Sequence, residues 1–232
     1  MLAPARGAAL AAARLYGARV ARGRLITIEG LDGAGKSTLA AGLADALREG
    51  GARVELLREP GGVEVSERIR DLVKDPRLAV SPRAEALLYA AARAQLVQEQ
   101  IEPLLAEGAV VLLDRFTDSS LAYQGAGRNL GIAEVRTINM FATGGLQPDR
   151  TLLLRIPPAE GRARQLERAE APDRLEREGD GFFAAIAAAY EQLAREEPAR
   201  IRVIDARGAP GEVLSLALAQ LDGLGLSAEG RH

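Results

Sequence analysis

Gly30-Leu-Asp-Gly-Ala-Gly-Lys36-Ser37 matches the phosphate-binding loop that joins a strand to a helix in many nucleotide-binding proteins. Glycine at Gly30 and Gly35 lets backbone N–H groups close around phosphate oxygens with no Cβ in the way. Lys36 is expected to reach the terminal phosphates, and the Ser37 hydroxyl to bind Mg²⁺. We therefore predict ATP as co-substrate and Mg²⁺ as cofactor. The predicted ATP-binding residues are Gly30, Leu31, Asp32, Gly33, Ala34, Gly35, Lys36, Ser37 and Thr38.

The segments on either side of the loop support this interpretation. Residues 24–29 are typical of a short buried strand, and residues 37–49 of a helix with Leu39, Leu43 and Leu47 on one face. A helix that begins directly after the loop makes an anion site from its backbone dipoles. The alternative is a glycine-rich turn that contains Lys-Ser by chance, and the flanking strand and helix argue against it.

Composition excludes several classes of function. The 232 residues suit one α/β domain, and 47% of them are hydrophobic. Without cysteine there is no disulfide, thiolate metal site or cysteine nucleophile, and the single histidine is the last residue, His232. A formal net charge of −2 argues against capture of nucleic acid by bulk charge. No apolar run reaches the ~18 residues of a membrane span, so no membrane association is expected.

Three regions are expected along the chain. Residues 1–23 carry several arginines and no acid, and we interpret them as an extension outside the domain. They fit a transit peptide, a loosely ordered arm or an upstream start codon; the lack of serine favours the last two, and hence a cytoplasmic protein. The nucleotide-binding domain is expected at residues 24–222 with a lid at about 161–179, and a tail at residues 223–232.

Strand-like and helix-like segments alternate after the loop, which is typical of a parallel sheet. We expect an α/β, P-loop NTPase-type three-layer fold with about five parallel strands, helices on both faces and a mobile lid. The strands are expected at residues 24–29, 53–57, 109–113, 151–156 and 201–204, the third being the most hydrophobic and therefore central. Helices are expected at residues 37–49, 65–73 and 82–107, the last bent or broken at Pro103.

Acidic side chains follow three of these strands. Ligands bind at the carboxyl ends of the strands in such sheets, so Asp32, Glu59 and Asp114 should share one edge. Asp114 ends an apolar strand, the setting of a carboxylate that acts on Mg²⁺, and Glu59 is a further candidate ligand. The alternative for Asp114 is to cap the helix that follows, and the two roles are compatible.

Residues 162–179 are densely charged and nearly free of large apolar side chains, so they cannot form a core element. A solvated helix with i,i+4 ion pairs is one interpretation. The other is a lid that closes over the nucleotide and brings arginines to the transferring phosphoryl group. The phosphate-binding loop favours the lid.

Between about Gly23 and Leu221 the chain resembles the thymidylate (dTMP) kinases of bacterial type with an arginine-rich lid. The motifs that carry the resemblance, in the order of that family, are Ile28–Thr38, Arg58–Gly62, Tyr89–Gln95, Asp114-Arg-Phe116 with Ser119-Ser-Leu-Ala-Tyr-Gln124, and Asp173–Glu176 before Phe182-Phe183 and Tyr190. The resemblance implies ATP-dependent phosphorylation of dTMP to dTDP, in dTTP synthesis, by a homodimer.

The resemblance also implies roles for individual residues. On the thymine side these are stacking by Tyr89, donation to a base carbonyl by Arg93, and further base recognition by Ser120 and Gln124. On the sugar and phosphate side they are contact with the sugar by Tyr123, contact with the 3′-hydroxyl by Asp32, and binding of the acceptor phosphate by Arg70 and Arg115 with help from Arg58. The implied catalytic residues are Lys36, Arg115, Arg164 and Arg168, with Arg174 behind them.

The chain departs from the family pattern around Tyr89, where phenylalanine is usual, and around Arg93. Ala92 and Leu96 stand where the family often has Asp and His, which removes the usual neighbours of Arg93. The loop also lacks the additional arginine of one subgroup, since Gly33-Ala34 stands there. In such an enzyme the lid supplies the arginine.

Two other classes of protein share parts of this pattern. Another nucleoside-monophosphate kinase would keep the loop and lid but change Tyr89, Arg93 and Gln124. A switch or partition ATPase or GTPase is the non-metabolic alternative, although a GTPase should carry an Asn-Lys-x-Asp motif and none is present. Lys36, Asp114 and Arg115 argue against a catalytically inactive nucleotide-binding module.

Overall fold

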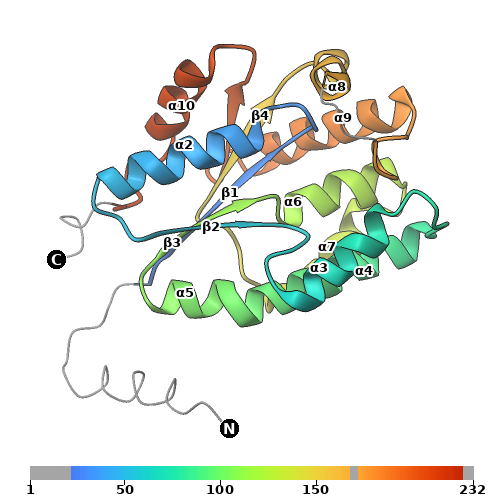
Figure 1. Cartoon of the computed structure of the whole chain (residues 1–232), viewed down its shortest axis with the longest axis horizontal. Coiled ribbons are helices and arrows are strands. Elements are labelled where there is room, and N and C mark those ends of the chain that lie inside the picture. The colour runs from blue at the N-terminus through green and yellow to red at the C-terminus, as the bar shows by residue number, and fades with distance from the viewer. Residues whose placement is uncertain (1–21, 168–171, 227–232) are drawn as a thin grey trace, which may run out of the picture.

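The computed structural model describes residues 22–167 and 172–226 (Figure 1). Most of the expected extension and tail, and Arg168 of the expected lid, lie outside the described residues. At the domain boundaries, the backbone N–H of Gly23 donates to Leu105 at 2.8 Å. Leu224 is buried in the core, and its carbonyl accepts a hydrogen bond from Arg24. The packed domain therefore includes both Gly23 and Leu224.

A five-stranded, wholly parallel sheet organises the fold, with strand order β2-β3-β1-β4-β5, and it confirms the predicted fold class. The strands are β1 (Arg24–Gly30), β2 (Val54–Arg58), β3 (Val110–Asp114), β4 (Arg150–Arg155) and β5 (Ile201–Asp205). The prediction that residues 109–113 form the central strand was wrong: β3 is an interior strand, but β1 occupies the middle. Both strands are buried on both faces, so hydrophobicity alone does not distinguish them.

Helices cover both faces of the sheet (Figure 1). On one face α2 (Lys36–Glu49) and α10 (Pro210–Ala219) pack together over Ile26, Leu112 and Leu154. The other face packs against the helices α4 (Pro82–Leu96), α5 (Glu102–Ala106), α6 (Thr117–Ser120), α7 (Ile132–Thr143) and α9 (Asp180–Glu196). The helix α3 (Glu64–Lys74) packs on α4. The short helix α8 (Pro158–Leu166) follows the carboxyl end of β4. The sequence did not predict α7, α9 or α10.

The expected long helix over residues 82–107 is interrupted, but not at Pro103 itself. A π-helical turn, η1 (Val97–Ile101), separates α4 from α5, and Pro103 lies in the first turn of α5. Proline has no N–H and its ring crowds the carbonyl four residues back, so the helix widens into a π-helical turn just before Pro103. A second π-helical turn, η2 (Leu121–Gly127), follows α6 and carries Tyr123 and Gln124.

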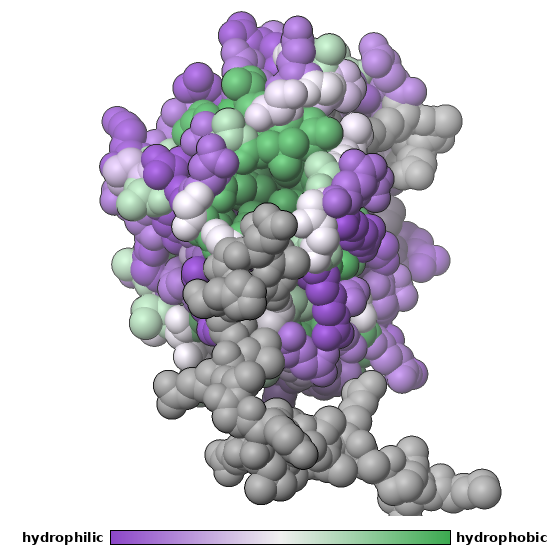
Figure 2. Space-filling model, turned by 90° about the vertical axis from the view of Figure 1, so that its left-hand side faces the viewer, coloured by the Kyte–Doolittle hydropathy of each residue, from purple (hydrophilic) through white to green (hydrophobic). Residues whose placement is uncertain are grey.

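The surface away from the carboxyl ends of the strands shows one apolar area framed by hydrophilic side chains (Figure 2). Among the described residues, no helix combines the length and the hydropathy that crossing a membrane requires.

Candidate active site

A pocket of about 360 Å³ opens at the carboxyl ends of the strands. It is lined by parts of the phosphate-binding loop (Asp32, Gly33, Gly35, Lys36 and Ser37) and by Asp114. All the residues predicted on the acceptor side also line it: Asp32, Arg58, Arg70, Tyr89, Arg93, Arg115, Ser120, Tyr123 and Gln124. Residues far apart in the sequence therefore meet in one cavity, as the position of the strand ends predicts.

A second cavity, of about 380 Å³, lies beside Gly30 and Leu31 and is bounded by β4, β5 and α9. It contains neither Lys36 nor any of the residues predicted to bind the acceptor. We therefore place the candidate site in the first cavity, because it brings Lys36 and Ser37 of the loop together with all the residues predicted to bind the acceptor.

The loop needs glycine for two different reasons. A Cβ on Gly30 would lie 2.5 Å from the carbonyl oxygen of Leu154, and one on Gly33 would collide with the carbonyl of Gly161. Gly35 has open space where its Cβ would stand, but its φ of 91° is one that side chains rarely adopt. The need for glycine at Gly33 was not recognised in the sequence, because it arises from close packing of α8 on the loop.

Lys36 is buried at the mouth of the loop. Its Nζ donates to the carbonyl of Leu31 at 2.9 Å and lies 3.7 Å from a carboxylate oxygen of Asp32. Burial, and then the charge of Arg115, lowers the pKa of Lys36 to about 8. The side chain is thus still mostly charged at pH 7. A bound phosphate would compete for its ammonium group with the carbonyl of Leu31 and the carboxylate of Asp32.

Asp114 and Ser37 lie together where a divalent cation would bind. The Ser37 hydroxyl donates to Asp114 Oδ2 at 3.0 Å, and Asp114 Oδ1 is buried with no hydrogen-bond partner. This donor set fits Mg²⁺, which takes one or two protein oxygens and completes its shell with phosphates and water. The alternative that Asp114 caps the next helix was wrong, because the N-cap of α6 is Phe116 and no side chain caps it.

Arg115 connects the loop to the acceptor side of the pocket. It has a φ of 70°, which is rare for residues other than glycine, and strained residues of this kind cluster at functional sites. Its guanidinium donates to the carbonyl of Gly30 at 3.2 Å, to Ser119 Oγ at 3.0 Å, and to Tyr123 and Asp32. Although burial opposes it, the charges of Arg115 and Lys36 hold the pKa of Asp32 below its usual range.

Arg93 is fully buried in the pocket wall, and each of its nitrogens is bound to a protein acceptor. Nε donates to Glu59 Oε2 at 2.7 Å, Nη1 to Ser120 Oγ at 2.9 Å and to Asn139, and Nη2 to the carbonyl of Phe116 at 2.9 Å. The support that Ala92 and Leu96 cannot provide thus comes from Glu59 and Asn139. Burial raises the pKa of Glu59 against the opposing charge of Arg93.

Glu85 was missed in the sequence, and it is the carboxylate that ties the base side of the pocket to the second part of the predicted lid, residues 172–179. It is fully buried and accepts from Gln124 Nε2 at 2.9 Å. It also pairs with Arg128 at 3.1 Å and with Arg174 at 2.6 Å. Its place four residues before Tyr89, on the same helix face, was the available signal. Arg174 is therefore held at the base side and not beside the phosphate-binding loop.

The described part of the predicted lid consists of residues 161–167, most of which lie in α8, and residues 172–179. Arg164 donates to the carbonyl of Ala206 at 3.1 Å and does not line the pocket. Arg168 lies outside the described residues. The backbone of Gly161 packs against the loop at Asp32 and Gly33, so α8 lies directly beside the phosphate-binding residues.

Comparison with known proteins agrees on one family. A family description named thymidylate kinase matches residues 28–216. The chain is 50% identical to the thymidylate kinase of Oenococcus oeni over 203 residues, which cover 85% of this chain and 94% of that protein. It is 47% identical to the thymidylate kinase of Ectopseudomonas mendocina, with 87% and 94% covered, and 48% identical to that of Bordetella pertussis, with 87% and 93% covered.

Proposed function

The chain belongs to the thymidylate kinase family, and from this premise we propose how its residues transfer a phosphoryl group from ATP to dTMP, giving dTDP. The observation that carries the proposal is the single cavity that joins Lys36 and Ser37 to Arg93, Tyr89 and Gln124. A switch ATPase needs Lys36 and Ser37 to bind its nucleotide, but it does not need a second subsite of the size of a base beside them.

The attacking oxygen of a nucleoside monophosphate is already ionised, so the reaction requires no strong general base. Catalysis must instead align two anions and neutralise the charge on the transferring group. Lys36 would bind the donor phosphates. Arg115, Arg70 and Arg58 would hold the acceptor phosphate, since they converge on the pocket beside the loop. This arrangement explains how the described residues, which include no histidine, suffice for the chemistry.

We propose that Mg²⁺ is held by Ser37 and Asp114, with the unpaired Oδ1 of Asp114 as its strongest protein ligand. The ion would neutralise charge on the donor phosphates. Glu59 stays a weaker candidate, since its Oε2 pairs with Arg93 at 2.6 Å and only its buried Oε1 is without a partner.

We propose that dTMP lies with its base between Tyr89 and the wall formed by Arg93, Ser120 and Gln124. Tyr123 and Asp32 would contact the sugar, since Tyr123 donates to Asp32 at 3.1 Å within the same cavity. A coupled ATP-consumption assay with dTMP, dUMP, dCMP and dGMP tests this assignment. We expect the highest kcat/KM with dTMP; a preference for dCMP or dGMP would assign the chain to another base.

The lid arginines should act mainly in the transition state. When the lid closes, water is excluded and an arginine beside phosphate acts at low effective dielectric. Arg164→Ala, Arg168→Ala and their double variant should therefore lower kcat, the double variant by on the order of 100-fold, while the KM for dTMP stays nearly constant. Steady-state kinetics check this, with the exposed Arg177→Ala as control. If the double variant kept the wild-type rate, the lid proposal would be wrong and the segment would be a solvated helix without a role in the reaction.

We propose that the chain forms a homodimer through the outer faces of α3, α4 and α7. These neighbouring helices expose Val65, Leu72, Leu87, Met140 and Phe141, and Phe141 is 92% exposed. Large apolar side chains that are exposed on adjacent helices are candidates for burial at an interface.

Phe141→Glu combined with Leu87→Glu should therefore convert a dimer to a monomer, because two charges would be buried at the contact. Light scattering after size-exclusion chromatography measures the mass directly. Leu216→Glu is the matched control, since Leu216 is 49% exposed on α10, on the opposite face of the sheet. A wild-type chain that is monomeric at all concentrations would contradict this proposal without affecting the reaction.

A further inference from the structure

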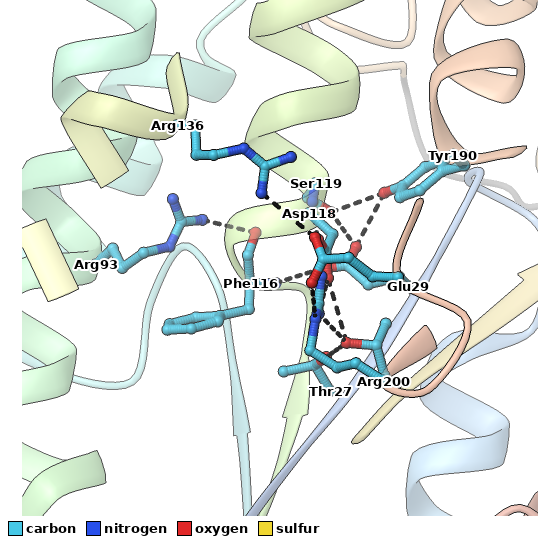
Figure 3. A network of polar contacts seen from close by, with 11 residues as sticks. Thr27, Glu29, Arg93, Phe116, Asp118, Ser119, Arg136, Tyr190 and Arg200 are labelled. Carbon is cyan, nitrogen blue, oxygen red and sulfur yellow. Dashed lines mark hydrogen bonds and ion pairs between the residues drawn. The ribbon is translucent and has the colours of Figure 1, made fainter. Parts of the chain in front are cut away.

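Glu29 is a buried acid that none of the roles above uses. It lies near the end of β1, immediately before the phosphate-binding loop, and its side chain is fully buried. Four donors converge on its carboxylate (Figure 3). Oε1 accepts from the backbone N–H groups of Phe116 at 2.8 Å and Ser119 at 3.2 Å. Oε2 accepts from the hydroxyls of Ser119 at 2.5 Å and Tyr190 at 2.9 Å.

These contacts hold the turn on which Arg115 lies. Phe116 directly follows Arg115, and Ser119 is one helical turn further on. By accepting from both backbone N–H groups, Glu29 fixes the start of α6, where no other side chain caps the helix. The left-handed conformation of Arg115 must be held by its surroundings. Its own backbone N–H donates to the carbonyl of Ile28 at 3.0 Å, and the bonds to Glu29 hold the residues that follow it in the turn.

A second path reaches the guanidinium itself. The Ser119 hydroxyl has one hydrogen, and it donates this hydrogen to Glu29 Oε2. Its oxygen is then free to accept from Arg115 Nη1, which lies 3.0 Å away. The hydroxyl of Tyr190 lies 3.0 Å from the same oxygen and closes the cluster. Glu29 thus sets the direction of the serine hydroxyl, and the serine sets the direction of the arginine.

The charged form of Glu29 suits this cluster, because a carboxylate only accepts hydrogen bonds whereas a protonated acid must also donate one. Protonation would place a hydrogen among four donors and turn at least one hydroxyl away. Burial and then the charge of Asp118 raise the pKa of Glu29 to about 7, while Ser119 and Arg115 oppose this. The charged groups that face it are Asp118, Arg115 and, at longer range, Lys36.

We propose that Glu29 is a positioning residue for phosphoryl transfer, which orients Arg115 toward the acceptor phosphate through Ser119 and through the backbone of the turn. The proposal rests on the proposed role of Arg115 in that site. It assigns no contact between Glu29 and either nucleotide. It predicts that removing the negative charge, with the shape kept, disturbs the reaction more than it disturbs the fold.

The test compares Glu29→Gln, Ser119→Ala and their double variant in steady-state kinetics and thermal unfolding. Each single variant should lower kcat by on the order of 10–100-fold, the cost of a misplaced catalytic group. The KM for ATP should change little, because the loop residues themselves are unaltered. The double variant should be no slower than the slower single variant, since both substitutions break one chain of contacts. Glu29→Asp, which keeps the charge, should recover part of the rate.

Thr27→Val is the matched control. Thr27 lies on the same strand, is equally buried and hydrogen-bonds Thr151 at 2.7 Å. Thr151 in turn contacts Asp118 and Arg200 rather than Glu29 or Arg115 (Figure 3). The control should keep the wild-type kcat even if its Tm falls. If Glu29→Gln does not fold, the kcat of Ser119→Ala alone tests the proposal.

Normal kcat in the folded variants, or rate losses that multiply in the double variant, would overturn the proposal. A failure of the function itself would differ, because wild-type protein would then not phosphorylate dTMP.

Discussion

Replacing Lys36 with alanine is expected to lower kcat by a factor of at least on the order of 10²–10³, because the ammonium stabilises charge that spreads over the transferring phosphoryl group. The fold should survive. Lys36 is buried at a cost, as its lowered pKa shows, and its ion-pair partner Asp32 stays paired with Arg115. Steady-state kinetics and thermal unfolding of the same sample measure both quantities.

Lys36→Arg separates charge from shape at this position. It keeps the positive charge, but a planar guanidinium does not fit a cradle built for a compact ammonium, so this variant should also be slow. If Lys36→Ala turned over at a near-normal rate, the loop would not be the donor site, whatever its glycine pattern.

Arg93→Ala should destabilise the protein by about 3–5 kcal/mol, the usual cost of removing one partner from a buried ion pair. Both Arg93 and Glu59 are almost completely buried, and truncation would leave the Glu59 carboxylate with no positive partner among the described residues. Ser120, Asn139 and the carbonyl of Phe116 would each lose a donor as well. Urea denaturation gives the free energy of unfolding.

The same variant should weaken the binding of dTMP more than that of ATP, by roughly 1.5–3 kcal/mol for the loss of a charge-assisted contact. Calorimetric titration with each nucleotide measures the difference.

The loss of folding stability in Arg93→Ala should become smaller at acidic pH. Because the pKa of Glu59 is already raised by burial, the stranded acid would take up a proton and lose its charge. Arg68→Ala, which removes an exposed pair with Glu64, is the control and should cost ~0–1 kcal/mol. A similar small loss for Arg93 would contradict the account.

The sequence contained enough information for the fold class and for the composition of the pocket. The glycine loop, its lysine and the alternation of strands and helices are local patterns, and the strand ends bring Asp32, Glu59 and Asp114 together by topology alone. The order of strands is not local. In the structure β1 rather than β3 lies at the centre of the sheet. The sequence did not predict this, because two strands that are buried on both faces look alike in sequence.

The buried acids were harder to find. Glu29 looked like the last residue of a strand, and Glu85 like an ordinary position near the start of a helix. Their importance depends on donors from distant parts of the chain, such as Tyr190 for Glu29 and Arg128 for Glu85. A single sequence with no partner information cannot indicate such pairs, since each partner lies on a different element.

The central claim is that one pocket passes a phosphoryl group from ATP to dTMP, and following the label from [γ-³²P]ATP tests it most directly. Purified protein, Mg²⁺, dTMP and labelled ATP are mixed, and the products are separated by chromatography. Our account predicts label in dTDP, formed in step with ADP, and formation of both at least on the order of 100-fold slower with Lys36→Ala. Label released as inorganic phosphate at a rate independent of dTMP would indicate an ATPase and contradict the account.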